Sequence, residues 1–252
     1  MPARPLSPLF RSPLKPLILA ALSLGAACAV PLRAAEPEGG QRLPAQTPVL
    51  AVVQVAKPWY APRRLVVARM RDTLAQYTAL PGLAFKAYAI GQTDGSFGGL
   101  YLWKDVASAR AWFSPAWFER VQRGRGVAGR VRFLQVVSVV DTVPGGTPAD
   151  SDSPSVATLL LAASGQGAPS TPITEAMVNA DRRVPGLLRR YRVVDDAGRS
   201  GVMSLWRDAA AARQQLDAHE QAAAEWFDTP ILLPSTQGGN QPRLPGLEGA
   251  AP

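Results

Sequence analysis

Two short strand-like segments carry side chains that together can do chemistry on a small organic molecule. The segment LAFKAYAIG contains Lys86 and Tyr88, and the segment GGLYLWKD contains Tyr101 and Trp103. Side chains two residues apart in a strand lie on the same face of a sheet. A cation, two phenols and an indole on one face predict a pocket with aromatic walls, which can bind a flat molecule and stabilise an enolate or phenolate.

Further polar and aromatic residues extend this candidate site. We expect Leu83, Phe85 and Ala87 to pack on helices, which leaves the other face of the strands to line a cavity. We assign catalytic roles to Lys86, Tyr101 and Trp103, and ligand-binding roles to Gln54, Tyr88, Arg190, Arg192, Ser204 and Trp206. Each tryptophan taken alone is slightly better explained as a core residue between sheets, as large aromatic residues usually are. The set as a whole favours a pocket.

The chain repeats one of these segments. GGLYLWKDVASAR at 98–110 and GVMSLWRDAAAAR at 201–213 share seven of thirteen positions, and the turn PGL occurs before both. The second copy has Ser204 where the first has Tyr101. The repeat therefore predicts an internal duplication in which only one copy is competent for chemistry.

The elements around both copies follow the order βαββαβ. In the first, a β-branched segment from Val49 precedes a helix that starts near Pro62, a hairpin, a helix capped by Asp105, and a last strand over 130–142. Such a unit forms a four-stranded sheet with both helices on one face, so the other face needs cover. We predict an α+β fold of two tandem ferredoxin-like units, packed sheet to sheet as a pseudo-dimeric α/β barrel with a cavity between the sheets.

Composition divides the chain into six segments. We expect a signal peptide and leader over 1–35, a flexible leader over 36–47, barrel half 1 over 48–143, a linker over 144–154, barrel half 2 over 155–233, and a disordered tail over 234–252. One chain containing both halves predicts a monomer.

The first residues have the pattern of an export signal. Three basic residues precede the apolar run PLILAALSLGAACAV, and small residues suitable for cleavage lie between Ala29 and Ala35. The run is shorter than the roughly 20 residues that a membrane-spanning helix needs. We therefore expect a periplasmic or secreted protein without stable membrane insertion. A lipoprotein anchored through Cys28 is a lesser alternative. Removal of residues 1–35 would lower the formal net charge from +8 to +4, and the remaining basic residues are interspersed with acids, which argues against nucleic-acid binding.

The stretch LPGLAFKAYAIGQTDGSFGGLYLWKDVASARAWFSPAWFERV resembles the YdhR-like monooxygenases, relatives of the antibiotic-biosynthesis monooxygenases in the dimeric α/β-barrel superfamily. The shared features are the Pro-Gly-Leu turn, the Lys-x-Tyr strand, Gly-Gly-x-Tyr-x-Trp and the acid-capped helix. The resemblance implies oxygenase chemistry on a small organic molecule, often without metal or flavin, in which the substrate anion itself passes an electron to O₂.

Two functions from different classes fit this sequence. The first is a cofactor-independent monooxygenase that acts on a small aromatic or quinone-like molecule; the second is a non-catalytic periplasmic protein that binds a small hydrophobic ligand. We expect no metal, because a single histidine and a single cysteine offer too few ligands. Haem binding through His219, on an apolar stripe of the last helix, is a lesser alternative. The motif G-x-G-x-x-G at 124–129 follows a helix and precedes a strand, so it is a turn rather than a dinucleotide site.

Overall fold

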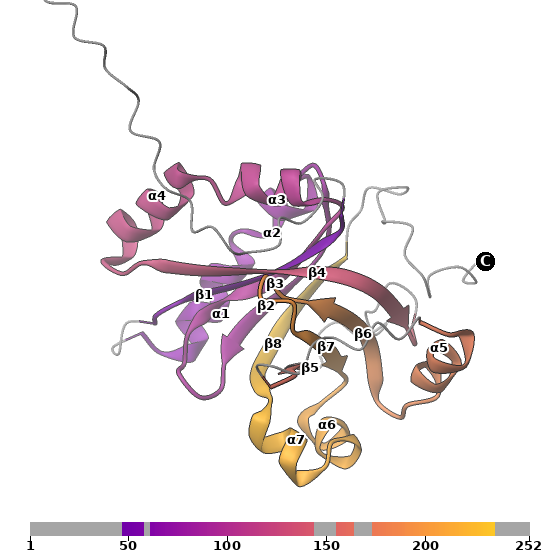
Figure 1. The fold of residues 1–252 in the computed structure, drawn as a ribbon. Coiled ribbons are helices and arrows are strands. Elements are labelled where there is room, and N and C mark those ends of the chain that lie inside the picture. The colour runs from indigo at the N-terminus through magenta and orange to yellow at the C-terminus, as the bar shows by residue number, and fades with distance from the viewer. Residues whose placement is uncertain (1–46, 58–60, 144–154, 164–172, 235–252) are drawn as a thin grey trace, which may run out of the picture. The chain divides into compact units, whose positions relative to one another are not determined.

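Eight antiparallel strands close into one barrel (Figure 1). The computed structural model describes residues 47–57, 61–143, 155–163 and 173–234. The strands are β1 Val49–Val55, β2 Leu83–Gly91, β3 Phe97–Trp103, β4 Gly129–Asp141, β5 Ser155–Leu161, β6 Leu187–Val194, β7 Ser200–Trp206 and β8 Glu225–Pro234. The predicted signal peptide, almost all of the leader, the linker 144–154 and the tail beyond Pro234 lie outside the described residues.

The strands follow one another around the barrel as β1-β3-β2-β8-β5-β7-β6-β4, and β4 pairs with β1 to close it. We call residues 47–143 the N-terminal half and residues 155–234 the C-terminal half. Each half contributes four neighbouring strands, and β2 pairs with β8 at one seam while β4 pairs with β6 at the other. The predicted α+β class and the barrel are therefore confirmed.

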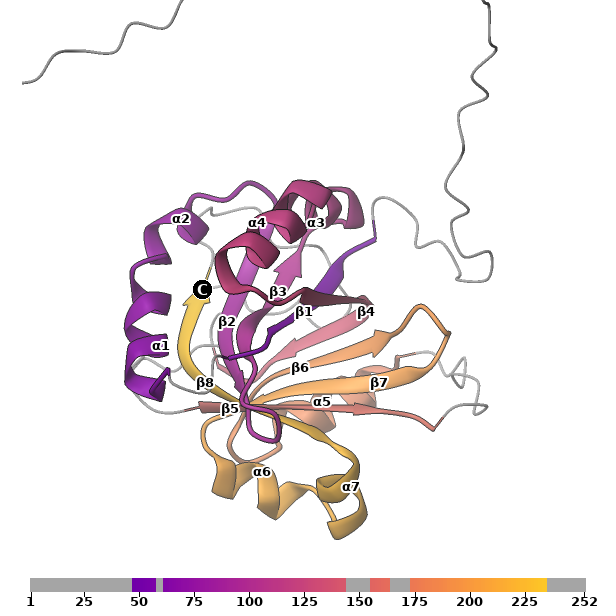
Figure 2. The ribbon, with the colours of Figure 1, turned by 90° about the vertical axis from the view of Figure 1, so that its left-hand side faces the viewer.

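The helices lie outside the barrel (Figure 2). They are α1 Arg63–Arg71, α2 Leu74–Thr78, α3 Val106–Trp112, α4 Pro115–Arg125, α5 Glu175–Arg182, α6 Ala209–Gln215 and α7 Ala218–Ala223. No helix among the described residues has the length and apolar character needed to cross a membrane.

The local signals read from the sequence form the structures expected of them. Asp105 precedes α3 and its carboxylate accepts from the Ser108 N–H at 2.6 Å, and Asp208 accepts from the Ala211 N–H at 2.7 Å ahead of α6. These bonds satisfy N–H groups that the first turn of a helix leaves without a partner. The helix that starts after Asp105 is interrupted before Pro115, because α3 ends at Trp112 and α4 begins at Pro115.

The two PGL turns are nearly identical in conformation. Gly82 and Gly186 have φ of 81° and 75°, values that side-chain-bearing residues rarely adopt. A Cβ on Gly82 would lie 2.7 Å from the Ser108 hydroxyl, and a Cβ on Gly186 would lie 2.4 Å from the Ala211 Cβ. Glycine is required at both turns because each one packs directly against the helix that follows the hairpin.

The apolar side chains of the strands form an inner and an outer layer. The inner cluster draws residues from all eight strands and from no helix, including Leu50, Phe85 and Leu102 of the N-terminal half and Tyr191 and Met203 of the C-terminal half. The outer clusters combine the alternate strand residues with helix residues. Apolar side chains therefore pack between the two sheets, where a cavity was predicted.

Charge pairs join the halves at both seams, and the pair at the β4–β6 seam is buried while the other is exposed. At the β4–β6 seam, Arg189 is 2% exposed and makes a two-pronged pair with Asp141. Burial alone would lower the pKa of Arg189, but Tyr191 and Asp141 raise it above its ordinary value, so the guanidinium stays charged. At the other seam, Arg63 of α1 pairs with Asp228 of β8.

Candidate functional site

A cavity of about 480 Å³ lies in the outer layer of the N-terminal half. Its floor consists of residues of β1, β2 and β3, among them Val53, Lys86, Tyr88, Phe97 and Tyr101. Its walls come from α1, α2 and α4, and include Val66, Met70, Tyr77, Trp117 and Arg120. The apolar residues make it suitable for an organic molecule, and the few polar groups would fix the orientation of that molecule.

Lys86 is the most unusual residue of the cavity. The residue is 1% exposed, and its Nζ lies 3.0 Å from the ring centre of Tyr77, 3.6 Å from that of Tyr88 and 4.6 Å from that of Tyr101. Within the described part of the chain, no carboxylate forms an ion pair with it. Burial lowers the pKa of Lys86 from 10.5 to about 5, so the amine is neutral and able to accept a proton at neutral pH. The ring faces would stabilise the ammonium once that proton is bound.

The three tyrosines around Lys86 are held by one another and by a helix. Burial raises the pKa of Tyr77 and of Tyr101, and a side-chain hydrogen bond between the two also affects both pKa values. The Tyr88 hydroxyl lies 2.8 Å from the Thr73 hydroxyl, and burial raises the pKa of Tyr88 to about 12. All three phenols therefore stay protonated at neutral pH and can donate hydrogen bonds.

The alternation read from the sequence groups these residues correctly but places them on the wrong side of the sheet. Lys86, Tyr88 and Tyr101 face the helices rather than the space between the sheets. The reverse holds for Phe85 and Ala87, which belong to the inner cluster. The predicted placement of these residues between the sheets is therefore wrong, because a period of two identifies residues that share a face and does not say which face the helices cover.

Trp103 and Gln54 lie near the cavity without lining it. Trp103 packs in the outer cluster with Phe113, their ring centres 6.0 Å apart, and its buried Nε1–H has no hydrogen-bond partner. Gln54 belongs to the other face of β1, where its amide donates to the Ser96 hydroxyl at 3.4 Å. Their predicted catalytic and ligand-binding roles remain predictions without a cavity contact.

The predicted residues of the C-terminal half form a closed ionic network. Arg190 and Arg192 pair with the two carboxylate oxygens of Asp181 on α5, at 2.7 and 2.6 Å. The Arg190 Nε–H also donates to the Ser204 hydroxyl at 3.1 Å, and the Arg190 guanidinium lies 5.7 Å from the Trp206 ring. Trp206 is buried and donates to the Thr158 hydroxyl at 2.9 Å. The structure brings Arg190, Arg192, Ser204 and Trp206 together, but around an ion-paired carboxylate rather than a cavity.

Sequence reasoning missed most of the residues that line the cavity, including Tyr77, Arg120 and Arg125. The expected single helix from Pro62 is in fact α1 and α2 with a break at Asp72 and Thr73, and the break lets Tyr77 turn toward the sheet. One signal was available. Tyr77 stands four residues before Pro81, as Asp181 stands four residues before Pro185, so the repeat itself indicates that both belong to the corresponding site.

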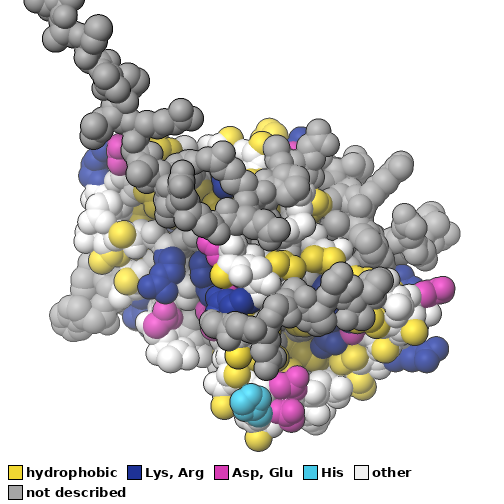
Figure 3. Space-filling view, in the orientation of Figure 1, with side chains coloured by type: hydrophobic (Ala, Val, Ile, Leu, Met, Phe, Trp, Pro, Cys, Tyr) yellow, Lys and Arg dark blue, Asp and Glu magenta, His cyan; other side chains and the backbone are white. Residues whose placement is uncertain are grey.

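His219 does not fit a haem ligand in this cavity. The expected last helix divides into α6 and α7, which breaks the apolar stripe, and His219 is exposed on α7 as the cyan side chain of Figure 3. It is not among the residues that line the cavity. In the described ranges, His, Cys, Asp and Glu form no group of three that could hold a metal ion. The described residues of this cavity therefore do not fit a haem or metal site.

The fold has counterparts among solved structures. One is a protein from Fusobacterium nucleatum subsp. nucleatum ATCC 25586 described as a "putative monooxygenase", with a TM-score of 0.54, 12% identity, and 75% of this chain and 94% of that chain aligned. Another so described, from Lactobacillus acidophilus NCFM, has a TM-score of 0.42 and 9% identity, over 75% and 96% of the two chains. An anthrone oxidase-like protein has a TM-score of 0.43 and 10% identity, over 79% and 96%.

These likenesses concern the fold alone, and the two with TM-scores below 0.5 add nothing to that argument. No protein-family model matches the chain, and no curated protein sequence matches it significantly. The barrel of this chain thus shares its fold with the Fusobacterium nucleatum protein. The YdhR-like assignment stays a prediction, and the reaction must be argued from the site.

Proposed function

We propose that this chain is an exported, cofactor-independent monooxygenase-like protein that acts on a small aromatic or quinone-like molecule in the cavity of the N-terminal half. One observation carries the proposal. The Lys86 amine is buried at the cavity wall between tyrosine rings, without a carboxylate partner among the described residues, and its pKa is lowered to about 5. Perturbed titratable groups in a cavity are typical of catalytic sites.

In this proposal Lys86 is the general base and the tyrosines orient the substrate. Lys86 accepts the proton of a hydroxyarene, and the phenolate stays beside the new ammonium, which the ring faces stabilise. The electron-rich ring carbon para to the oxygen forms a bond to O₂, and protonation gives a hydroperoxide. Loss of water, from the C–H proton and the distal OH, leaves a carbonyl. One oxygen atom enters the product, the other leaves as water, and the arene is oxidised to a quinone by four electrons.

We also propose that the two halves are duplicated ferredoxin-like units and that the mature chain is a monomer. Both halves have the same order of strands within the barrel, the same glycine turn and the same aspartate cap. Light scattering at low concentration should give the mass of one chain. Export is tested by fractionation and by the mass of the mature N-terminus: cleavage near Ala29 to Ala35 supports it, and an acylated Cys28 would mean a lipoprotein.

The reaction is tested with 1,5-dihydroxynaphthalene, whose oxidation by one O₂ gives 5-hydroxy-1,4-naphthoquinone and one water. We expect the protein to accelerate oxygen uptake and quinone formation, and Lys86→Met to lower kcat/KM at least tenfold, within the usual contribution of a general base. Lys104→Met is the matched control, because Lys104 is half-exposed outside the cavity. Binding without oxygen uptake in the wild type would refute catalysis of this reaction and favour the ligand-binding alternative.

A further inference from the structure

The charges around the cavity are all of one sign. Arg69, Arg120 and Arg125 line it beside the neutral amine of Lys86, and no Asp or Glu is among the described residues that do so. The surrounding half shares this bias, because the N-terminal half carries 13 Lys and Arg against 5 Asp and Glu, while the C-terminal half carries 8 against 9. The positive potential is therefore concentrated in the half that contains the cavity.

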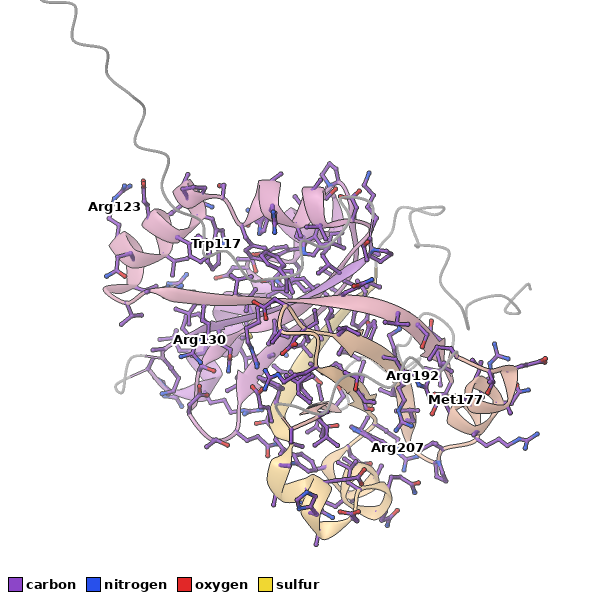
Figure 4. All side chains as sticks on the ribbon, viewed as in Figure 1. Trp117, Arg123, Arg130, Met177, Arg192 and Arg207 are labelled. Carbon is purple, nitrogen blue, oxygen red and sulfur yellow. The ribbon has the colours of Figure 1, made fainter. Side chains whose placement is uncertain are left out.

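Helix α4 directs two of these arginines to the cavity by its periodicity. Trp117, Arg120, Val121, Gly124 and Arg125 all line it, at spacings of three, four and one that mark one face of an α-helix. Figure 4 shows Trp117 directed toward the strands and Arg123 directed away from the molecule on the same helix. Arg123 is exposed and is not a lining residue, so α4 supplies its own control for any test of charge.

Among the described residues, the two arginines of this helix face have no acidic partner. Arg120 donates only to the backbone oxygen of Ala116, at 3.4 Å, and its charge acts to lower the pKa of Tyr77, which places it near the tyrosine cluster. The Arg125 guanidinium lies 5.2 Å from the centre of the Phe97 ring, another cavity residue. Within the described chain neither forms an ion pair with a carboxylate. Arg69, across the cavity on α1, pairs with Asp72 instead.

We propose that the cavity takes an aromatic carboxylate or a comparably anionic arene, whose charged group lies between Arg120 and Arg125 while its ring packs against the tyrosines and Phe97. This inference deepens the proposed function and uses the same cavity. A guanidinium offers paired N–H donors that match a carboxylate, and two of them without acidic partners leave that capacity open. The inner part of the cavity, with Lys86 neutral and three protonated phenols, carries no net charge, so the anion is favoured at the arginines.

The test compares 2-naphthoate with 2-naphthamide, which have the same ring and differ in charge. Isothermal titration at pH 7.5 and low salt should show at least tenfold tighter binding of naphthoate by the wild type. The double variant Arg120→Gln, Arg125→Gln should lose this preference and bind naphthamide as before. Arg123→Gln removes one charge outside the cavity and is the matched control for the single variant Arg120→Gln. Arg123→Gln should bind naphthoate as the wild type does.

Two results would overturn the inference: equal affinity of the wild type for both compounds, or an equal loss of naphthoate affinity in Arg123→Gln and Arg120→Gln, which would mean general surface charge. The outcome is independent of the oxidation assay. Arginine-dependent naphthoate binding without any oxygen uptake would sustain the anion site and reject the oxygenase. Oxidation of dihydroxynaphthalene with no preference for naphthoate would do the reverse.

Discussion

The corresponding sites of the two halves contain different side chains on the same backbone. Tyr77, Lys86, Tyr88 and Tyr101 of the N-terminal half correspond to Asp181, Arg190, Arg192 and Ser204 of the C-terminal half. In the first set, a neutral amine lies between rings beside a cavity. In the second, one carboxylate forms ion pairs with two guanidinium groups.

This difference separates a site that is open to a ligand from one that is not. In the ionic network each arginine has a carboxylate partner, because each oxygen of Asp181 forms an ion pair with one of them. The amine of Lys86 has no such partner within the described residues. A substrate with a hydroxyl group can supply that partner by donating its proton to the amine. The comparison assigns chemistry to the N-terminal half and a structural role to the network in the C-terminal half.

The largest expected effect is on the ionic network. Asp181→Asn leaves two largely buried arginines without a carboxylate, and removing one partner of a buried pair costs about 3–5 kcal/mol. We expect urea unfolding to show a loss of that size. Tyr77→Phe, at the corresponding position, should cost only about 1 kcal/mol through the lost hydrogen bond to Tyr101. Similar losses for the two variants would remove the proposed contrast between the halves.

The second prediction concerns the pH dependence of stability. Lys86 has a pKa of about 5 in the folded state and 10.5 when unfolded, so between these values the unfolded chain binds a proton that the folded chain does not. The free energy of unfolding should therefore rise with pH across this window, by up to about 1.4 kcal/mol per unit from this group.

Lys86→Met should remove this contribution. The free energy of unfolding of the wild type should therefore rise relative to that of the variant by up to about 4 kcal/mol from pH 6 to pH 9. Chemical denaturation at several pH values measures it, with Lys104→Met as the control. Parallel pH profiles for the wild type and Lys86→Met would show that the amine is not held neutral.

The third prediction uses the two tryptophans. Trp103→Phe and Trp206→Phe each reduce the side-chain volume, which should lower the free energy of unfolding by about 1–2 kcal/mol. Only Trp206→Phe also removes a hydrogen bond, the one to Thr158. Trp206→Phe should therefore be the more destabilising by about 1 kcal/mol. Thermal or urea denaturation of the two variants in parallel decides it, and the opposite order would contradict the hydrogen-bond argument.

The smallest effect is expected where the halves agree. Asp105→Ala and Asp208→Ala each remove a carboxylate that accepts from the first turn of a helix, which costs about 1 kcal/mol in either half. The two losses should match within about 0.5 kcal/mol by urea denaturation. A marked inequality would mean that the corresponding helices contribute differently to the two halves.

The sequence by itself determined the local structure of this protein. The element order, the PGL turns, the caps at Asp105 and Asp208 and the grouping of Lys86, Tyr88 and Tyr101 on one face all follow from short-range preferences: positive φ at glycine, carboxylates at helix starts and the period of two in strands. The expectations for the first residues, the linker and the tail concern parts of the chain that the structure does not describe, and they stay predictions.

Only the tertiary structure decided where the site lies. Alternation is symmetric, so it cannot say which face of β2 and β3 turns toward the helices, and the choice is made when eight strands close and the inner cluster fills the barrel. The helices α2 and α4 carry Tyr77, Arg120 and Arg125. Their separation from Lys86 in the sequence does not determine how close to Lys86 they lie in the fold. The cavity exists because long-range packing brings those helices over one sheet, and no local preference encodes that.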